Sequence, residues 1–203
     1  MGAVGFIGIG VLVLLVLYFI LTYNKLVKLR NRIEAAWAQI DVQLKRRHDL
    51  IPNLVETVKG YASHERETLE AVTRARQQAV AADGVENQAQ AENMLTGALR
   101  QLFAVSEAYP DLKANTNFLA LQEELTGTEG RIAYARQFYN ESTLSYDNAL
   151  ESFPSNIVGG AFNFEPKPYF EAETTEREAV KVDFGQGGGT QPPSTPASPP
   201  AVP

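Results

Sequence analysis

The sequence contains no cysteine and only two histidines, His48 and His64. Without cysteine the chain forms no disulfide, no thiolate metal site and no lipid attachment through an N-terminal cysteine. A catalytic zinc site needs about three protein ligands, for example from a helix with the H-E-x-x-H motif, and that motif is absent. The phosphate-binding P-loop and the dinucleotide-binding glycine motif are absent as well. We therefore predict no metal, no cofactor and no catalytic residue, and a protein that is not an enzyme.

Charge is missing from the first 24 residues. The stretch 2–22 is almost wholly apolar, and about 20 such residues in a helix cross the roughly 30 Å hydrocarbon core of a bilayer. A cleaved secretory signal would begin with a basic residue and end in a small-residue cleavage site, whereas bulky Tyr23 follows here. The sequence therefore predicts a retained transmembrane anchor at residues 1–24, with the lipid bilayer as partner.

Four basic residues follow the anchor directly: Lys25, Lys28, Arg30 and Arg32. Positive residues stay on the cytoplasmic side, so we expect a bacterial inner-membrane protein with its N-terminus outside and its bundle and C-terminus in the cytoplasm. Tyr18 and Tyr23 suit the aromatic belt at the membrane interface, and Lys25 and Lys28 would reach the headgroups beyond it. The net charge is −6, and a mildly acidic folded part with a basic collar argues against a nucleic-acid-binding protein, which would need a contiguous basic face; nucleic acid is therefore not an expected partner.

No glycine or proline interrupts the chain between Gly10 and Pro52, so the anchor helix is expected to continue into the folded part. Pro52 removes one backbone hydrogen bond and is expected to kink the helix near His48, and Gly60 is expected to end it. From Ile33 onward, steps of four and three indicate a helix buried along one stripe. This seam comprises Ile33, Trp37, Ile40, Leu44, Arg47, Ile51, Leu54, Val58 and Tyr61.

Three more helices are expected: one that Ser63 caps and that stops near Asp83, one over about 87–107, and a long one from Asn115 to Phe153. Their inner faces comprise Leu69, Val72, Ala75, Ala79 and Val80 in the second helix, Met94, Leu95, Ala98, Leu99, Leu102 and Phe103 in the third, and a three-four series from Phe118 to Phe153 in the fourth. These patterns predict an all-α fold, in which the transmembrane helix continues into a long-helix antiparallel, four-helix-type bundle over residues 25–155.

The chain after the bundle changes in character twice. Residues 156–184 form an aromatic, extended segment that we expect to pack on the bundle, with a short strand or clasp at 180–184. Residues 185–203 hold six of the eleven prolines and predict a disordered Gly/Pro-rich tail.

Arg46, Arg47, His48 and Asp49, just before Pro52, are the strongest candidates for an interaction site. Arg47 lies on the buried seam, where a charge needs a partner. Glu123 or Glu124 of the fourth helix would supply that partner, and the alternative is an anion-binding or protein-binding site at the kink.

Gly127 and Gly130 interrupt the long fourth helix, and each costs about 1 kcal/mol relative to alanine in a helix interior. Close backbone approach to another helix, within one subunit or between two, would offset that cost. Local flexibility is the alternative explanation.

Several separate blocks of the sequence resemble the LemA family: residues 37–61 followed by His64-Glu65, 121–125, Thr128-Glu129, Arg131-Ile132, Ala135-Arg136, Tyr139-Asn140, Phe153-Pro154, Tyr169-Phe170 and 182–184. The resemblance covers roughly residues 5–184. It implies an N-terminal transmembrane helix, a cytoplasmic antiparallel helical bundle and no known catalytic activity. It also implies genes for membrane proteostasis nearby, and hence a membrane protease or another membrane protein as a further partner.

These observations favour a non-enzymatic, single-pass scaffold or adaptor that forms homo-oligomers at the cytoplasmic membrane face. A regulatory adaptor for a membrane protease or an envelope-stress system is the alternative. An enzyme is a third hypothesis, and it would need polar residues gathered in a pocket around Arg46 to Asp49.

Overall fold

The computed structural model describes the backbone of residues 2–170, and the side chains of all of these except residues 3–5. The chain divides into two units, Met1–Ala172 and Glu173–Pro203. The expected strand at 180–184 and the expected tail at 185–203 lie outside the described residues. Between residues 2 and 170 the regular structure is helical throughout and includes no strand, which confirms the predicted all-α fold.

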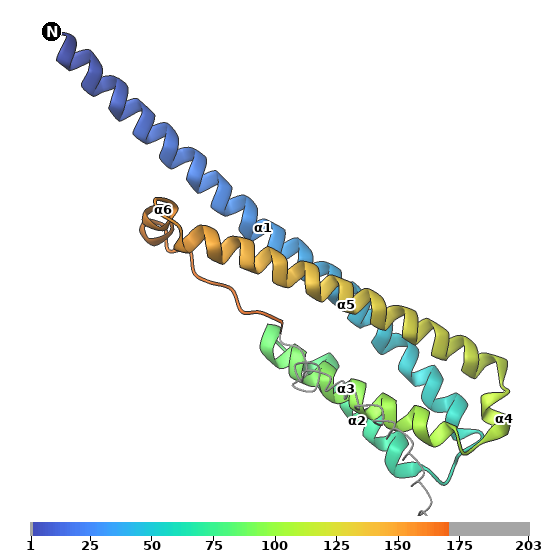
Figure 1. Ribbon diagram of the computed structural model, residues 1–203. Helices are drawn as coiled ribbons and strands as arrows, with labels where there is room; N and C mark the ends of the chain where they lie inside the picture. The colour runs from blue at the N-terminus through green and yellow to red at the C-terminus, as the bar shows by residue number, and fades with distance from the viewer. Residues whose placement is uncertain (1, 171–203) are drawn as a thin grey trace, which may run out of the picture. The chain divides into compact units, whose positions relative to one another are not determined.

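Helix α1 (Ala3–Lys59) has 57 residues and is by far the longest helix in Figure 1. At 1.5 Å per residue it extends for about 85 Å. It passes through Pro52 without ending, so the predicted continuation of the anchor into the folded part is confirmed.

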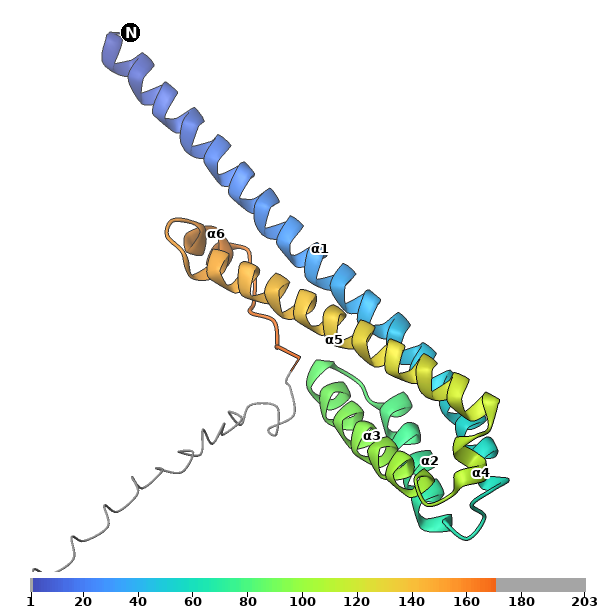
Figure 2. The same ribbon diagram turned by 45° about the vertical axis from the view of Figure 1, so that its right-hand side comes forward.

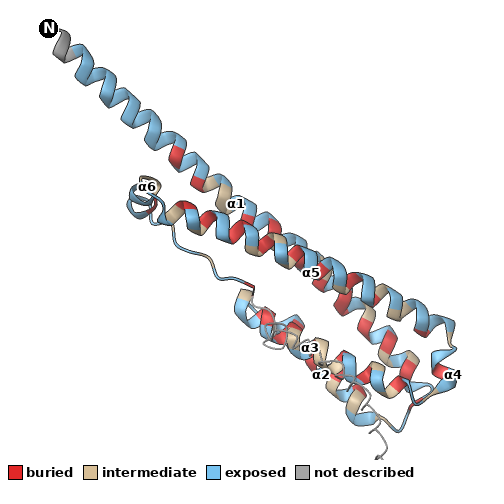
Figure 3. Cartoon of the chain, in the orientation of Figure 1, coloured by how far each residue is buried: buried red, intermediate tan, exposed pale blue. Residues whose placement is uncertain are grey.

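The N-terminal part of α1 is exposed along almost its whole surface (Figure 3). Its most apolar 18-residue window has a mean hydropathy of 2.6, and only 6% of that window is buried. The core helix of a soluble protein would be covered by its neighbours, whereas this helix is not. By length and composition it is the one helix among the described residues that could cross a membrane, which suggests membrane anchoring.

Helix α5 (Thr116–Glu151) runs antiparallel to α1 over the whole folded part (Figures 1 and 2). Its start is fixed by Asn115, whose side-chain oxygen accepts a hydrogen bond from the backbone N–H of Phe118 at 3.0 Å. The predicted start at this residue is confirmed. The two long helices share a core made of Ile33, Ala36, Ile40 and Leu44 from α1 and Ile132, Ala135, Tyr139 and Tyr146 from α5.

Helices α2 (Arg66–Ala81) and α3 (Val85–Ser106) form a hairpin through Gly84, whose φ of 80° suits glycine. The hairpin packs on the half of α1 and α5 that is remote from the anchor, and the short α4 (Pro110–Lys113) links α3 to α5. The buried members of this second core include Ile51, Leu54, Val58, Leu69, Val72, Leu95, Leu99, Leu102, Phe118 and Leu125. The bundle is therefore four-helical only in this half.

Nearer the anchor, the segment that follows α5 packs on α1 and α5 instead of the α2–α3 hairpin. The backbone N–H of Phe170 donates to Asn140 Oδ1 at 2.9 Å, and the Tyr139 hydroxyl donates to the carbonyl of Pro168 at 2.8 Å. The buried Phe170 ring lies 6.1 Å from the ring of Trp37. The aromatic segment thus packs on the bundle as expected up to Phe170, but its beginning is helical rather than extended, since α6 spans Ser155–Ala161.

Some predicted core positions are wrong. Tyr61 and Phe153 are 45% and 80% exposed because they lie beyond the last residues of α1 and α5, where the helical phase no longer applies. Val80 and Met94 are each 57% exposed, because the α2–α3 hairpin is covered on one side only and both residues lie beside that face. Ser63 does not cap α2, which begins after Glu65.

Candidate functional site

The seam of α1 directs Arg47 into the bundle, where it is only 2% exposed. Its Nη1 donates to Glu92 Oε2 at 3.2 Å, and its Nη2 donates to Thr96 Oγ1 at 2.7 Å and lies 3.3 Å from Glu129 Oε2. The prediction of Glu123 or Glu124 as the partner of Arg47 is therefore wrong. The long helix α5 does supply one partner, but the buried one comes from α3.

Glu92 is the acceptor around which this polar network is built, and it is 3% exposed. Besides its contact with Arg47, the Glu92 carboxylate forms hydrogen bonds with His48 Nε2 at 2.7 Å and with Gln88 Nε2 at 2.9 Å. Gln88 also donates to the carbonyl of Ala79 at 3.0 Å. A buried charge pair is tolerated when further hydrogen bonds satisfy both ions, and here they do so for the carboxylate. The network connects α1 with α2 and α3.

The sequence contained a signal for Glu92 that an apolar pattern overlooks. Gln88, Glu92, Leu95, Leu99 and Leu102 follow one another in steps of four and three, so the two polar residues belong to the inner face of α3. A charged residue in such a series faces the core and needs a partner of opposite charge.

Pro52 creates a further polar contact. Because proline has no N–H, the carbonyl of His48, four residues earlier, loses its helical donor. Arg76 of α2 donates its Nε–H to this carbonyl at 2.7 Å. The proline thus leaves a free carbonyl on α1, and a hydrogen bond to this carbonyl links α2 to α1.

The other candidates of this stretch lie on the surface. Arg46 points outward and forms an ion pair with Glu124 of α5, while Asp49 and Glu123 are exposed. The four residues 46–49 are therefore divided between the core and the surface and do not face one pocket. Within the part of the chain that the structure describes, no group of three or more His, Asp or Glu side chains is placed to hold a metal ion.

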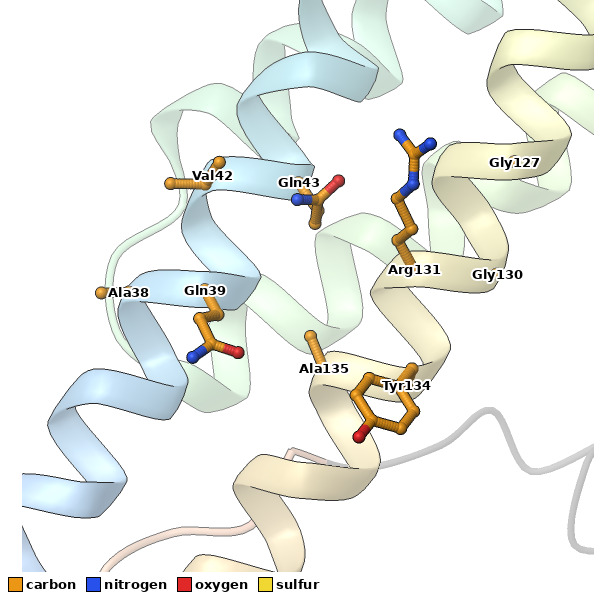
Figure 4. A pocket seen from close by; sticks show the side chains of 9 residues that line it. All are labelled: Ala38, Gln39, Val42, Gln43, Gly127, Gly130, Arg131, Tyr134 and Ala135. Carbon is orange, nitrogen blue, oxygen red and sulfur yellow. The ribbon is translucent and has the colours of Figure 1, made fainter.

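A groove of about 650 Å³ runs between α1 and α5 on the outer surface of the pair (Figure 4). Val42 and Tyr134 flank it and are 63% and 71% exposed. Figure 4 shows the backbone of α5 bare at Gly127 and Gly130. The groove is lined by Ala38, Gln39, Val42 and Gln43 of α1 and by Gly127, Gly130, Arg131, Tyr134 and Ala135 of α5.

The two mid-helix glycines are not explained by packing inside the subunit. A Cβ atom added at Gly127 or Gly130 would meet no heavy atom of the described residues within 4 Å. The alternative of close approach within one subunit is therefore wrong for this part of the chain. Gln43 adds a second unexplained group, because its Oε1 is buried and has no hydrogen-bond partner among residues 2–170.

The residues expected at the membrane interface lie where α1 leaves its apolar stretch. Tyr18 and Tyr23 are each 38% exposed, and Lys25 and Lys28 are exposed as well. The ring of Tyr23 contacts the rings of two aromatic residues that follow α6.

Comparison with known proteins gives a consistent result. The model of the LemA family matches residues 36–184. Protein LemA of Metamycoplasma hominis is 29% identical over 187 residues, which cover 84% of this chain and 83% of that protein. Magnetosome protein MamQ of Magnetospirillum gryphiswaldense is 23% identical over 185 residues, with coverage of 78% and 68%. Magnetosome protein MamQ 2 of Paramagnetospirillum magneticum is 25% identical over 189 residues, with coverage of 78% and 70%.

Proposed function

Because the chain belongs to the LemA family, we propose that it is a non-enzymatic, single-pass membrane scaffold whose copies associate through the α1–α5 groove. The uncovered apolar part of α1 supports attachment to a membrane. Two relatives are named magnetosome proteins, a name that states a cellular structure and no reaction, and this supports a structural role.

The open groove over Gly127 and Gly130 is the observation that carries the proposal. Each glycine costs about 1 kcal/mol in a helix interior, and no close contact within the described chain requires a glycine at either position. A helix of a second copy could approach the bare backbone closely and bury the exposed Val42 and Tyr134 against its own surface.

A second copy is the occupant that the anchor favours. In one membrane every copy stands at the same height, with its groove at the same distance from the lipid. Confinement to a surface raises the effective concentration of one groove for another. A repeated, identical contact produces a closed ring or a patch of bundles. The basic residues from Lys25 to Arg32 support a position of the proposed assembly on the cytoplasmic face of a bacterial inner membrane.

The test is the oligomeric mass of the full-length protein in lipid nanodiscs and in detergent, measured by mass photometry over a range of concentrations. The wild-type protein is expected to form oligomers, and Gly130→Leu is expected to remain monomeric because the added side chain fills the groove. The matched control is Gly97→Leu in α3. Gly97 is also mid-helical and open to added atoms, but it lies away from the groove, so this variant is expected to associate like the wild type.

Three results would count against the proposal in different ways. A wild-type protein that is monomeric at every concentration contradicts the scaffold itself. Oligomers that persist in Gly130→Leu show that the groove is not the interface. If instead a photo-crosslinker at residue 42 captures a membrane protease or a stress-response protein from native membranes, the alternative function as a regulatory adaptor replaces the scaffold.

A further inference from the structure

An uncharged, apolar segment follows α5 at the end of the folded part that is nearest the anchor. Residues 152–164 contain no Asp, Glu, Lys or Arg. Three large apolar side chains of this segment are exposed: Phe153 by 80%, Ile157 by 53% and Phe162 by 54%. The turns at the opposite end of the bundle carry charged residues instead, among them Glu65, Arg66, Asp111 and Lys113. Exposed apolar groups gathered in one segment indicate a contact surface.

Helix α6, within this segment, is packed firmly against the two long helices. Val158 is fully buried in a small core with Leu26 of α1 and Ala149 of α5. A Cβ atom at Gly159 would lie 2.9 Å from Leu150 Cδ2, so the glycine permits the close approach of α6 to α5. Val158 and Gly159 thus face inward, whereas the neighbouring Ile157 stays 53% exposed.

The same segment touches α1 where its apolar stretch ends. The ring of Phe162 lies 4.9 Å from the ring of Tyr23, and the ring of Phe164 lies 5.6 Å from it. Tyr23 directly follows Thr22, the last residue of the apolar stretch, and Thr22 is only 7% exposed. Figures 1 and 2 both show α6 beside α1 at the level where the two long helices begin to run together.

The height of this contact above the membrane follows from helix geometry. Leu26, which packs against Val158 of α6, lies four residues after Thr22, or about 6 Å farther along the helix axis. The headgroup region adds about 5–7 Å on each side of the roughly 30 Å hydrocarbon core. With the hydrocarbon core ending at Thr22, the level of α6 coincides with the headgroup layer, next to the boundary with the acyl chains where Phe and other large apolar side chains of interfacial helices insert.

We propose that α6 and its flanking residues are a second membrane contact, in which Phe153, Ile157 and Phe162 enter the boundary between headgroups and acyl chains. The inference rests on the proposed anchoring of α1, because it is the span that brings the bilayer to this segment. Two attachments side by side restrict the tilt and rotation of α1, which a single span leaves free. Every copy of the scaffold would then present its groove in the same direction along the membrane.

The absence of native cysteine permits single-cysteine labelling of the full-length protein. Ile157→Cys carries an environment-sensitive fluorophore, and the protein is reconstituted in vesicles of phosphatidylcholine and phosphatidylglycerol with or without nitroxide-labelled lipids. Leu15→Cys reports on the span itself. Leu119→Cys is the matched control, because Leu119 is an apolar residue of α5 that is 48% exposed at the far end of the bundle.

A nitroxide at the top of the acyl chains is expected to remove about half of the emission at residue 157 or more, and to leave residue 119 unquenched. If residue 157 behaves like residue 119 while a deep nitroxide quenches residue 15, the second contact is refuted and the anchor stands. If residue 15 is not quenched either, the anchoring on which the inference rests is itself refuted.

A charge substitution tests the same contact without a label at residue 157. In a protein labelled at Phe162→Cys, Ile157→Glu is expected to abolish the quenching by the shallow nitroxide, because a carboxylate resists transfer into the interface. Ile157 is exposed, so the substitution leaves the core of α6 intact. Leu119→Glu in the same background is expected to change nothing. Unaltered quenching in Ile157→Glu would show that Ile157 does not enter the membrane.

Discussion

Replacing Glu92 with leucine is expected to destabilise the bundle by about 3–5 kcal/mol, the range for removing one member of a buried ion pair. Leucine has a similar volume, so the loss reports on charge rather than on a cavity. The side chains of Glu92 and Arg47 are 4% and 3% exposed, so solvent screens the remaining charge very little. In the variant Arg47 retains only Thr96 and the half-exposed Glu129, and the imidazole of His48 loses its acceptor.

The measurement is urea-induced unfolding of the full-length protein in detergent micelles, followed by far-ultraviolet circular dichroism and by the emission of the single tryptophan, Trp37. Coincidence of the two transitions justifies a two-state free energy. The double variant Arg47→Met/Glu92→Leu is expected to be more stable than Glu92→Leu alone, because no unpaired charge then stays in the core. Glu123→Leu, at an exposed position of α5, is the control and is expected to change stability by about 0.5 kcal/mol or less.

Two results would refute this reasoning. A Glu92→Leu variant within about 1 kcal/mol of the wild type would mean that the carboxylate contributes little more than a neutral hydrogen-bond acceptor. The Arg47→Met single variant completes the comparison. If the double variant loses as much stability as Arg47→Met and Glu92→Leu together, Arg47 and Glu92 are not coupled.

Two further predictions follow from contacts outside the ion pair. Arg76→Met is expected to lower the free energy of unfolding by about 1–3 kcal/mol, because the carbonyl of His48 is left without a donor. The loss is expected to be smaller in a Pro52→Ala background, where residue 52 regains its N–H. Urea unfolding of the four proteins measures this coupling, and equal losses in both backgrounds would contradict it. Burial raises the pKa of Tyr139 in the folded protein. The stabilisation that the protonated Tyr139 provides is therefore complete below the unfolded pKa of about 10 and is lost as the pH rises through the folded pKa. The phenolate formed there cannot donate to the carbonyl of Pro168. Alkaline unfolding should therefore be weaker in Tyr139→Phe than in the wild type, and equal alkaline losses would refute this assignment.

The long helices could be predicted from the sequence because several local signals agree. The unbroken stretch from Gly10 to Pro52 and the regular seam from Ile33 describe α1, and Asn115 marks the start of α5. Where a helix ends, however, the phase of the seam is lost. For that reason Phe153 was expected in the core and is instead the most exposed large residue of its segment.

Helix α6 could not be predicted, because tertiary contacts rather than local preference produce it. Its seven residues include Gly159 and Gly160, which disfavour a helix in isolation. The burial of Val158 against Leu26, a residue far away in the sequence, stabilises the turn. Likewise the sequence drew attention to Gly127 and Gly130, but only the arrangement of α1 and α5 shows that the space above them is open.

The position of the groove along α1 connects these features. Its α1 residues, Ala38 to Gln43, lie between two places where α1 is fixed to α5. On the side of the apolar N-terminal stretch Leu26 packs with Ala149, and on the other side Arg46 and Arg47 form ion pairs with Glu124 and Glu129.

Because both ends are fixed, the two walls of the groove are held at one spacing, so the proposed association would need little further ordering of the backbone. Under the proposed scaffold function, the polar network therefore helps to hold the docking surface in shape. A charged pair in a core that apolar residues could fill suggests a hypothesis about register: the fixed partners of Arg47 would select one register of α1 against α3 and α5, which leucines alone would select less strictly.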